Sequence, residues 1–278
     1  MILIKKGEGT TDMLKTEMRN EKTMHIDRMS ALEIAKVMNE ENMNAVRAVE
    51  KELDSVAEGI EAITKAFSNG GRLFYVGAGT SGRLGVLDAS ECPPTFGVPE
   101  SMVVGIMAGG QEALSRAGEG EEDSAEAGKA DIEKYDLKQE DVVVGISASG
   151  GAAYVNSALE YAKSLGCIII GITSNAGSLL DKMADISICP DTGAEVVTGS
   201  TRLKAGTAQK LILNMLSTGA MIKSGYVYEN LMINLEPGNS KLRQRMVRIT
   251  SDILNVSYKD AEQRLEQSGW SIKKAIEM

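Results

Sequence analysis

The 278-residue chain contains a single histidine, His25, and this scarcity limits the chemistry that it can perform. A Ser-His-Asp triad needs a histidine as its base, and histidine-rich metal sites need several, so the sequence argues against both. Acid–base work must then fall mainly to Glu, Asp, Lys or Tyr side chains. We therefore expect a site whose protons are moved chiefly by carboxyl groups.

Other scarcities restrict the setting in which the protein works. The three cysteines, Cys92, Cys167 and Cys189, lie far apart and lack the spacing of metal or redox motifs, which favours a reducing cytoplasm. No apolar run is long enough to span a membrane, and residues 1–6 do not begin a signal peptide, so we expect a cytoplasmic protein. A net charge of −9 argues against a nucleic-acid partner.

The chain is organised around one glycine-rich stretch, residues 77–85, which follows a short apolar run at 72–77 and precedes a helix-length segment. Strand, turn and helix in this order aim backbone N–H groups and a positive dipole end at one point, where an anion can sit. The Gly-x-Gly-x-x-Gly spacing also fits the dinucleotide fingerprint, but no carboxylate ends the next strand, 102–107. A compact phosphate is our leading interpretation, with a dinucleotide and a plain tight turn as alternatives.

The hydrophobic pattern predicts an α/β fold. Apolar residues at helical spacing indicate two helices between Ser30 and about Asn69, with a break near 41–42. Short runs that are apolar on both faces then alternate with helical segments, as in a parallel sheet covered on both sides. We expect a three-layer α/β/α domain with about five parallel strands, at 72–77, 102–107, 141–146, 167–172 and 185–189.

These patterns divide the chain into four parts. We predict an N-terminal arm with helices at 1–57, an α/β domain at 58–224, a linker at 225–239 and a small helical C-terminal segment at 240–278. The α/β domain should close with a long helix at 201–223. The helix that follows the glycine turn should end near Cys92, because the residue before a proline disfavours helical geometry.

Hydroxyl groups gather where three of the predicted strands end. In open α/β sheets, ligands bind beyond the carboxyl ends of the strands, so these loops should lie together. Several hydroxyl donors at one sheet edge suit a phosphate monoester, whereas the alternative is that they are ordinary loop residues. The candidate phosphate-binding residues are Gly79, Thr80, Ser81, Ser147, Ser149, Thr173 and Ser174.

Glu91 is the first candidate for an acid, because it falls in the last predicted turn of its helix, where the negative dipole end disfavours a carboxylate anion. The alternative is an ordinary surface or capping glutamate. An acidic run could supply a second carboxyl group or merely form a solvated helix start, and spacing does not choose among its members. Lys204 and Lys210 either lie near the site or flank the long helix. The acidic run comprises Glu119, Glu121, Glu122, Asp123 and Glu126.

Six stretches of the chain form one recognisable set of motifs: Thr16–Asn20, Ile26–Arg28, Gly77–Gly85, Asp88–Thr95, Gly118–Ser124 and Ala194–Lys210. Together they resemble the N-acetylmuramic acid 6-phosphate etherases, a family within the sugar isomerase (SIS) domain superfamily. The similarity covers about residues 16–250, and the two longest motifs are specific to the etherases.

The resemblance implies a homodimeric carbon–oxygen lyase that removes D-lactate from N-acetylmuramic acid 6-phosphate, in amino-sugar metabolism and peptidoglycan recycling. It implies that Glu91 protonates the leaving group, that Glu122 is the second catalytic carboxylate, and that no metal or other cofactor takes part. Lys204 joins the substrate-binding residues, and the N-terminal arm is expected to cross to the partner. A sugar-phosphate isomerase and a non-catalytic sugar-phosphate sensor remain alternatives.

Three departures from the family pattern stand out. Residues 151–153, Gly-Ala-Ala, occupy the place where the family usually has Arg-Thr-Pro, which removes a polar contact near the phosphate or sugar. Phe96 replaces a common tyrosine. The chain also ends after one helical hairpin where relatives usually continue, which bears on dimer stability and on closure of the site.

Overall fold

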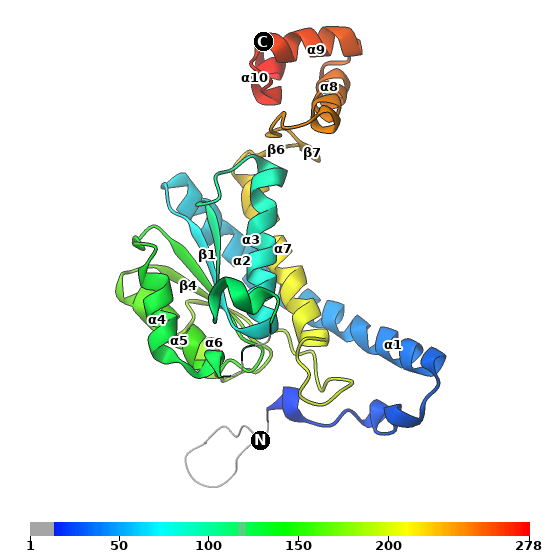
Figure 1. The fold of residues 1–278 in the computed structure, drawn as a ribbon, viewed down its shortest axis with the longest axis vertical. Coiled ribbons are helices and arrows are strands. Elements are labelled where there is room, and N and C mark those ends of the chain that lie inside the picture. Colours follow the sequence, from blue (N-terminus) through cyan, green and yellow to red (C-terminus); the bar gives the residue numbers. More distant parts are fainter. Residues whose placement is uncertain (1–13, 117, 119) are drawn as a thin grey trace.

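The computed structural model describes residues 14–116, 118 and 120–278, so the first 13 residues of the expected arm lie outside it. It contains an N-terminal arm with a projecting helix, a central α/β/α body and a C-terminal helical segment beyond the opposite end of the body (Figure 1). None of the described helices is both long and apolar enough to cross a membrane.

The body is built on a five-stranded parallel sheet in the order β2-β1-β3-β4-β5. The predicted three-layer α/β fold with about five parallel strands is confirmed, and each strand falls inside its predicted run. The strands are β1 (Leu73–Gly77), β2 (Val103–Met107), β3 (Val142–Ile146), β4 (Ile168–Ile172) and β5 (Ile186–Ile188).

Successive side chains along each strand pack alternately into two separate hydrophobic cores, one on each face of the sheet. In β1, Leu73 and Tyr75 face one core while Phe74 and Val76 face the other, because successive side chains point to opposite faces of a sheet. All four are fully buried, which explains why the strands read as continuous apolar runs. One face is covered by α1 (Ala31–Glu50), α2 (Leu53–Ser68), α3 (Gly79–Phe96) and α7 (Lys204–Lys223), and the other by α4 (Ala125–Glu133), α5 (Ala153–Ser164) and α6 (Leu179–Met183).

Two helix boundaries differ from the prediction. Helix α1 is continuous through the predicted break at 41–42, because Glu41 is buried in an ion pair with Lys204 of α7 and does not interrupt the helix. Its start agrees with the sequence, since Ser30 and Glu33 form a capping box. Helix α3 also runs past Cys92 and contains both Pro93 and Pro94 before Gly97 ends it in the left-handed conformation.

The arm and the connections consist of short turns. The arm contains η1 (Lys15–Glu17), η2 (Glu21–Thr23) and η3 (Ile26–Arg28), and two more 3-10 turns, η4 (Gly110–Leu114) and η5 (Glu121–Asp123), follow β2. The predicted linker at 225–239 contains a small hairpin that the sequence did not indicate, formed by β6 (Val227–Tyr228) and β7 (Leu231–Met232). The long C-terminal helix of the body begins at Lys204 instead of residue 201.

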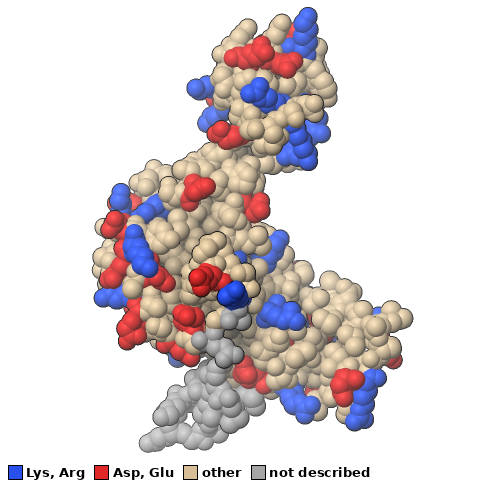
Figure 2. All heavy atoms as spheres, viewed as in Figure 1, with Lys and Arg blue, Asp and Glu red and all other residues tan. Residues whose placement is uncertain are grey.

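The C-terminal segment has its own apolar core, in which Met246, Leu265 and Ile272 are fully buried. It consists of α8 (Ser240–Leu254), α9 (Tyr258–Gln267) and α10 (Ile272–Glu277), and α8 begins at the predicted boundary. Figure 2 shows Lys and Arg side chains spread over its visible face. With eight Lys or Arg and five Asp or Glu it is basic within an otherwise acidic chain. The four-part division of the chain stays a prediction.

Candidate active site

The turn between β1 and α3 is one of the tightest points of the fold. A Cβ atom at Gly77 would lie 2.6 Å from the backbone nitrogen of Gly82, and one at Gly82 would lie 2.6 Å from the Gly77 oxygen, so both positions require glycine. Ala78 is the N-cap of α3, and no described side chain caps the helix there. The first N–H groups of α3 are therefore open at the carboxyl edge of the sheet.

A second helix start meets the first one. Strand β3 ends in the serine loop, residues 147–151, where Ser147 and Ser149 have their hydroxyl oxygens 3.4 Å apart. Each serine oxygen also accepts a backbone N–H, Ser147 from Gly150 at 3.1 Å and Ser149 from Gly151 at 3.2 Å. Helix α5 then begins behind Ala152, again without a side-chain cap. Its dipole adds to that of α3.

These elements enclose a cavity of about 270 Å³, which we call the hydroxyl pocket. Two uncapped helix starts and several hydroxyl groups converge there, a combination that suits a phosphate group. Five of the predicted phosphate-binding residues are brought together: Gly79, Thr80, Ser81, Ser147 and Ser149 line the pocket. The other lining residues are Thr16, Glu17, Ala78, Glu122, Ile146, Ala148, Ala152, Gly199 and Thr201.

Two predicted phosphate ligands lie behind this pocket instead of lining it. Thr173 is fully buried, and its hydroxyl donates to the carbonyl of Ala148 at 3.3 Å. The backbone N–H of Ser174 donates to the same carbonyl at 3.0 Å. Neither residue lines the hydroxyl pocket itself, and their observed contacts hold Ala148 of its lining, and with it the serine loop, in place.

In the single chain the N-terminal arm lies against the pocket, and its expected crossing to a partner stays a prediction. Asn175 joins arm to body: its amide donates to Thr16 Oγ1 at 3.3 Å and to the Ala148 carbonyl at 2.8 Å, while its oxygen accepts the Lys15 N–H at 3.1 Å. Thr16 and Glu17 then line the cavity. The family motif pointed to these residues, but nothing in the sequence gave them a place in the site.

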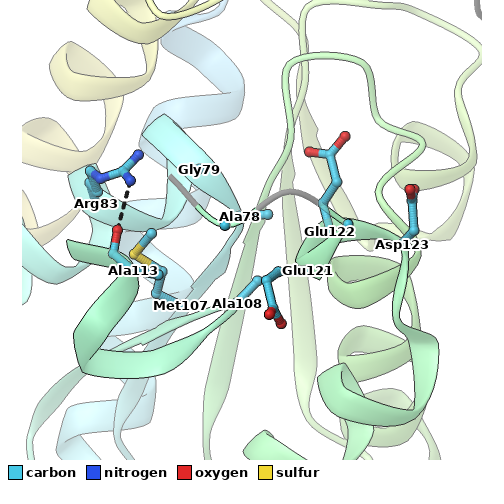
Figure 3. A pocket seen from close by; sticks show the side chains of 11 residues that line it. Ala78, Gly79, Arg83, Met107, Ala108, Ala113, Glu121, Glu122 and Asp123 are labelled. Atoms are coloured by element: carbon cyan, nitrogen blue, oxygen red, sulfur yellow. Dashed lines mark hydrogen bonds between the residues drawn. The ribbon is translucent and has the colours of Figure 1, made fainter. Parts of the chain in front are cut away.

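A second cavity of about 280 Å³ adjoins the first, and Figure 3 shows its lining. Both cavities are lined by Ala78, Gly79 and Glu122, so Glu122 lies where they meet. In Figure 3 its carboxylate points away from that of Glu121. Arg83 lies on the wall of the second cavity and donates to the Ala113 carbonyl at 2.6 Å, which holds the loop after β2.

Glu91 is not near these cavities in the single chain. It is exposed on α3, twelve residues beyond Gly79. A rise of about 1.5 Å per residue puts about 18 Å of helix between them. Leu87, one turn earlier on the same face, is also exposed, at 51%. One chain therefore does not bring Glu91 and Glu122 together.

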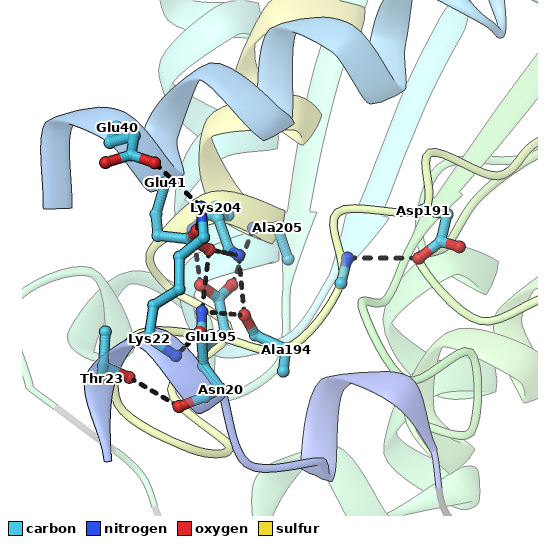
Figure 4. Close-up of polar contacts among 11 residues, drawn as sticks. Asn20, Lys22, Thr23, Glu40, Glu41, Asp191, Ala194, Glu195, Lys204 and Ala205 are labelled. Atoms are coloured by element: carbon cyan, nitrogen blue, oxygen red, sulfur yellow. Dashed lines mark hydrogen bonds and ion pairs between the residues drawn. The ribbon is translucent and has the colours of Figure 1, made fainter. Parts of the chain in front are cut away.

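Lys204 lies in a buried polar network that joins three distant segments (Figure 4). Its ammonium donates to Glu41 Oε2 at 2.6 Å and to the Ala194 carbonyl at 2.7 Å. Asn20 of the arm donates to the same Glu41 oxygen at 2.8 Å. Lys204 is 1% exposed and does not line the hydroxyl pocket, so its observed contacts are structural.

The pKa values of the two buried carboxyl groups here, Glu41 and Glu195, shift in opposite directions. For Glu41, burial is the largest influence and opposes ionisation, but hydrogen bonds from Lys204, Asn20 and Lys22 outweigh it and lower its pKa to about 2. For Glu195, burial dominates and raises the pKa, although its oxygens accept the N–H groups of Ala205 and Lys204. Glu195 thereby caps α7.

Comparison with known proteins places this chain in a family. The Glucokinase regulatory protein N-terminal SIS domain matches residues 55–163, and the SIS domain matches residues 123–219. Among solved structures, a putative phosphosugar isomerase involved in capsule formation from Bacteroides fragilis is similar, with a TM-score of 0.56 at 22% identity over 74% of this chain and 98% of that one. A phosphoheptose isomerase from Francisella tularensis gives a TM-score of 0.54 at 19% identity, over 70% and 100%. These two structures support the fold.

Curated relatives are much closer in sequence. An N-acetylmuramic acid 6-phosphate etherase of Clostridium botulinum (strain Loch Maree / Type A3) is 52% identical over 96% of this chain and 88% of its own length. Etherases of Actinobacillus pleuropneumoniae serotype 5b and Oceanobacillus iheyensis are each 51% identical, over 95% and 96% of this chain and 86% and 91% of their own lengths. The chain belongs to the N-acetylmuramic acid 6-phosphate etherase family.

Proposed function

We propose that this protein cleaves the D-lactyl ether of N-acetylmuramic acid 6-phosphate, giving D-lactate and N-acetylglucosamine 6-phosphate in the recycling of cell-wall amino sugars. Relatives that carry this name at about half identity over nearly the whole chain support the activity. The observation that carries the mechanism is the position of Glu122, on the shared wall of a phosphate-type pocket and a second cavity. No observation specifically favours an isomerase or a sensor.

The hydroxyl pocket would hold the 6-phosphate. Hydroxyl groups of Thr80, Ser147 and Ser149 donate to its oxygens, and the two helix dipoles favour its charge. The hydroxyl of Ser81 donates to Gln209 Oε1 at 2.9 Å, so Ser81 offers the phosphate its position at the start of α3 and not its hydroxyl proton. With the phosphate held there, the sugar extends past Glu122 toward the second cavity. The pocket thus fixes the distance between the phosphate and the reacting carbons.

Elimination from the open-chain sugar needs one base and one acid. The C1 aldehyde acidifies the proton on C2, and Glu122 accepts that proton while the C3–oxygen bond breaks. An acid protonates the departing oxygen, which leaves as D-lactate. Water then adds across the C2–C3 double bond of the unsaturated intermediate: its hydroxyl group goes to C3, its other proton goes to the carboxylate left by the acid, and Glu122 returns a proton to C2. Carboxyl groups can carry every one of these protons.

A second copy of the chain would supply the acid. Glu91 of the same chain lies about 18 Å along α3 from the pocket, too far to act on a sugar held there. It is exposed beside Leu87, as expected for a surface that a partner covers. We therefore infer a homodimer in which Glu91 of the partner subunit completes each site. A cytoplasmic location fits the free thiols of all three cysteines.

The test is release of D-lactate from N-acetylmuramic acid 6-phosphate by the full-length chain. We expect turnover by the wild type, and a loss of at least about 100-fold in kcat for Glu91→Gln and for Glu122→Gln. Glu126→Gln, which changes a neighbouring exposed carboxylate outside both cavities, is the matched control and should keep wild-type activity. A wild type that releases no lactate would refute the proposed activity.

A further inference from the structure

Glu17 brings a carboxylate into a pocket that otherwise looks built for an anion. It lines the hydroxyl pocket together with Ser147, Ser149 and the start of α3. Its Oε2 atom lies 3.2 Å from the point that a Cβ of Gly199 would occupy, and Gly199 has a φ of +76° and also lines the pocket. A side chain at position 199 would crowd the Glu17 carboxylate.

The position of Glu17 is fixed by its neighbours. Next to it, Thr16 is 1% exposed and accepts the amide of Asn175, and Leu14 is 4% exposed. On the other side of the turn, Lys15 pairs with Asp191. These contacts join the arm to the residues that follow β4 and β5, so the Thr16–Asn175 hydrogen bond and the Lys15–Asp191 ion pair hold the Glu17 backbone at the pocket.

The carboxylate itself has no protein partner among residues 14–116, 118 and 120–278. Its oxygens accept no hydrogen bond and form no ion pair there, although the side chain is half-buried. The acidic residues of the network behind it, by contrast, are satisfied: Glu41 has three donors and Glu195 has two. A partly buried carboxylate needs donors, so a bound ligand is the natural source of them.

The donors cannot be the phosphate oxygens, because two anions repel each other. We propose that Glu17 is a substrate-contacting specificity residue, which accepts hydrogen bonds from the sugar hydroxyls next to the phosphate-bearing carbon. This rests on the proposed function. In N-acetylmuramic acid 6-phosphate these groups are the C4 hydroxyl and, in the open chain, the C5 hydroxyl. Glu17 then selects a phosphorylated sugar over a bare phosphate, since it attracts the hydroxyls and repels the anion.

The affinities for two ligands distinguish a substrate-contacting role of Glu17 from a purely structural one. Calorimetry would compare N-acetylglucosamine 6-phosphate and inorganic phosphate on wild type, Glu17→Gln and Glu17→Ala, all full-length. We expect Glu17→Gln to weaken sugar-phosphate binding about tenfold and Glu17→Ala to weaken it further, because hydrogen bonds to charged groups are strong. Inorganic phosphate should bind the variants as tightly as the wild type, or more tightly, because the repulsion is removed. Glu21→Gln, an exposed change on the same arm, should alter neither affinity.

Weaker binding of the sugar phosphate together with unchanged or tighter binding of inorganic phosphate is the result that supports the proposal. Parallel weakening of both would show that the arm had moved and would overturn it, as would unchanged sugar-phosphate affinity in both Glu17 variants or no sugar-phosphate binding by the wild type. In the lactate assay, Glu17→Gln should raise KM and leave kcat within about threefold of the wild type. If the wild type releases no lactate while the two affinities still diverge, the proposed activity fails and the role of Glu17 in sugar-phosphate binding stands.

Discussion

The ammonium of Lys204 lies 2.6 Å from the carboxylate of Glu41, and the two side chains are 2% and 4% exposed. This pair joins the first turn of α7 to the middle of α1, a separation of 163 residues in sequence. Asn20 contacts the same carboxylate, so the arm that carries Glu17 is attached to the network as well.

Breaking this pair should destabilise the protein more than it affects substrate binding. We expect Lys204→Met to lower the free energy of unfolding by about 3–5 kcal/mol, because it leaves Glu41 buried with fewer donors. Denaturant unfolding measures the loss. The control is Lys223→Met, which removes an exposed pair with Glu61 and should cost less than about 1 kcal/mol. A tenfold rise in KM with unchanged stability would instead show that Lys204 binds substrate.

The same network predicts a pH dependence of stability. The pKa of Glu41 is about 2 in the folded chain against an ordinary value of 4.5, so its ionised form stabilises the fold above about pH 4.5 and this contribution disappears as the pH falls through about 2. The full contribution is about 3 kcal/mol. Glu195, whose pKa is raised, acts in the opposite direction. The difference in unfolding free energy between wild type and Glu41→Gln isolates Glu41, and it should shrink over that range. A constant difference would contradict the assignment.

Much of the fold could be predicted from the sequence because the sequence patterns that indicate strands and loops are local. Each strand is a short apolar run, and hydroxyl residues follow the strands directly, so Thr80 and Ser147 could be placed at one sheet edge. Glu41 was read as a helix break because its partner is far away in the chain. Glu17 was missed as a site residue for the same reason, since its position depends on contacts with Asn175 and Asp191.

The prediction that α3 ends near Cys92 was wrong for a different reason. The residue before a proline disfavours helical geometry, yet α3 continues through Pro93 and Pro94 to Phe96, although the two prolines donate no N–H to the carbonyls of Ala89 and Ser90. Gly97 then ends the helix, and its position against the Asn234 backbone, 1.9 Å from a hypothetical Cβ, leaves room for glycine alone. A local rule was overridden by packing against the linker.

Removing one hydroxyl from the pocket should weaken phosphate binding without unfolding the chain. For Ser147→Ala we expect the Kd for inorganic phosphate to rise about tenfold, because a hydrogen bond to a charged group contributes roughly 1.5–3 kcal/mol. Calorimetry measures this change. Ser164→Ala, at the far end of α5, removes an exposed hydroxyl that bonds Tyr161 and should leave the Kd unchanged. Equal effects of the two substitutions would argue against the hydroxyl pocket as the phosphate site.

The uncapped start of α5 offers a stabilising substitution. Ala152 is its N-cap residue, and a threonine there can accept a backbone N–H of the first turn. We expect Ala152→Thr to raise the free energy of unfolding by about 1 kcal/mol. Ala152→Val has the same shape without the hydroxyl and should give no gain. Thermal unfolding of the three proteins decides, and an identical response of the two variants would rule out capping as the cause.

Whether two chains share each active site is tested most directly by mixing two inactive variants. Glu91→Ala and Glu122→Ala are each expected to release no lactate alone. After they are unfolded and refolded together, about half of the dimers are mixed, and each mixed dimer has one intact site, so about a quarter of wild-type activity should return. Activity that stays at the level of the separate variants would contradict a site built from Glu122 of one subunit and Glu91 of the other.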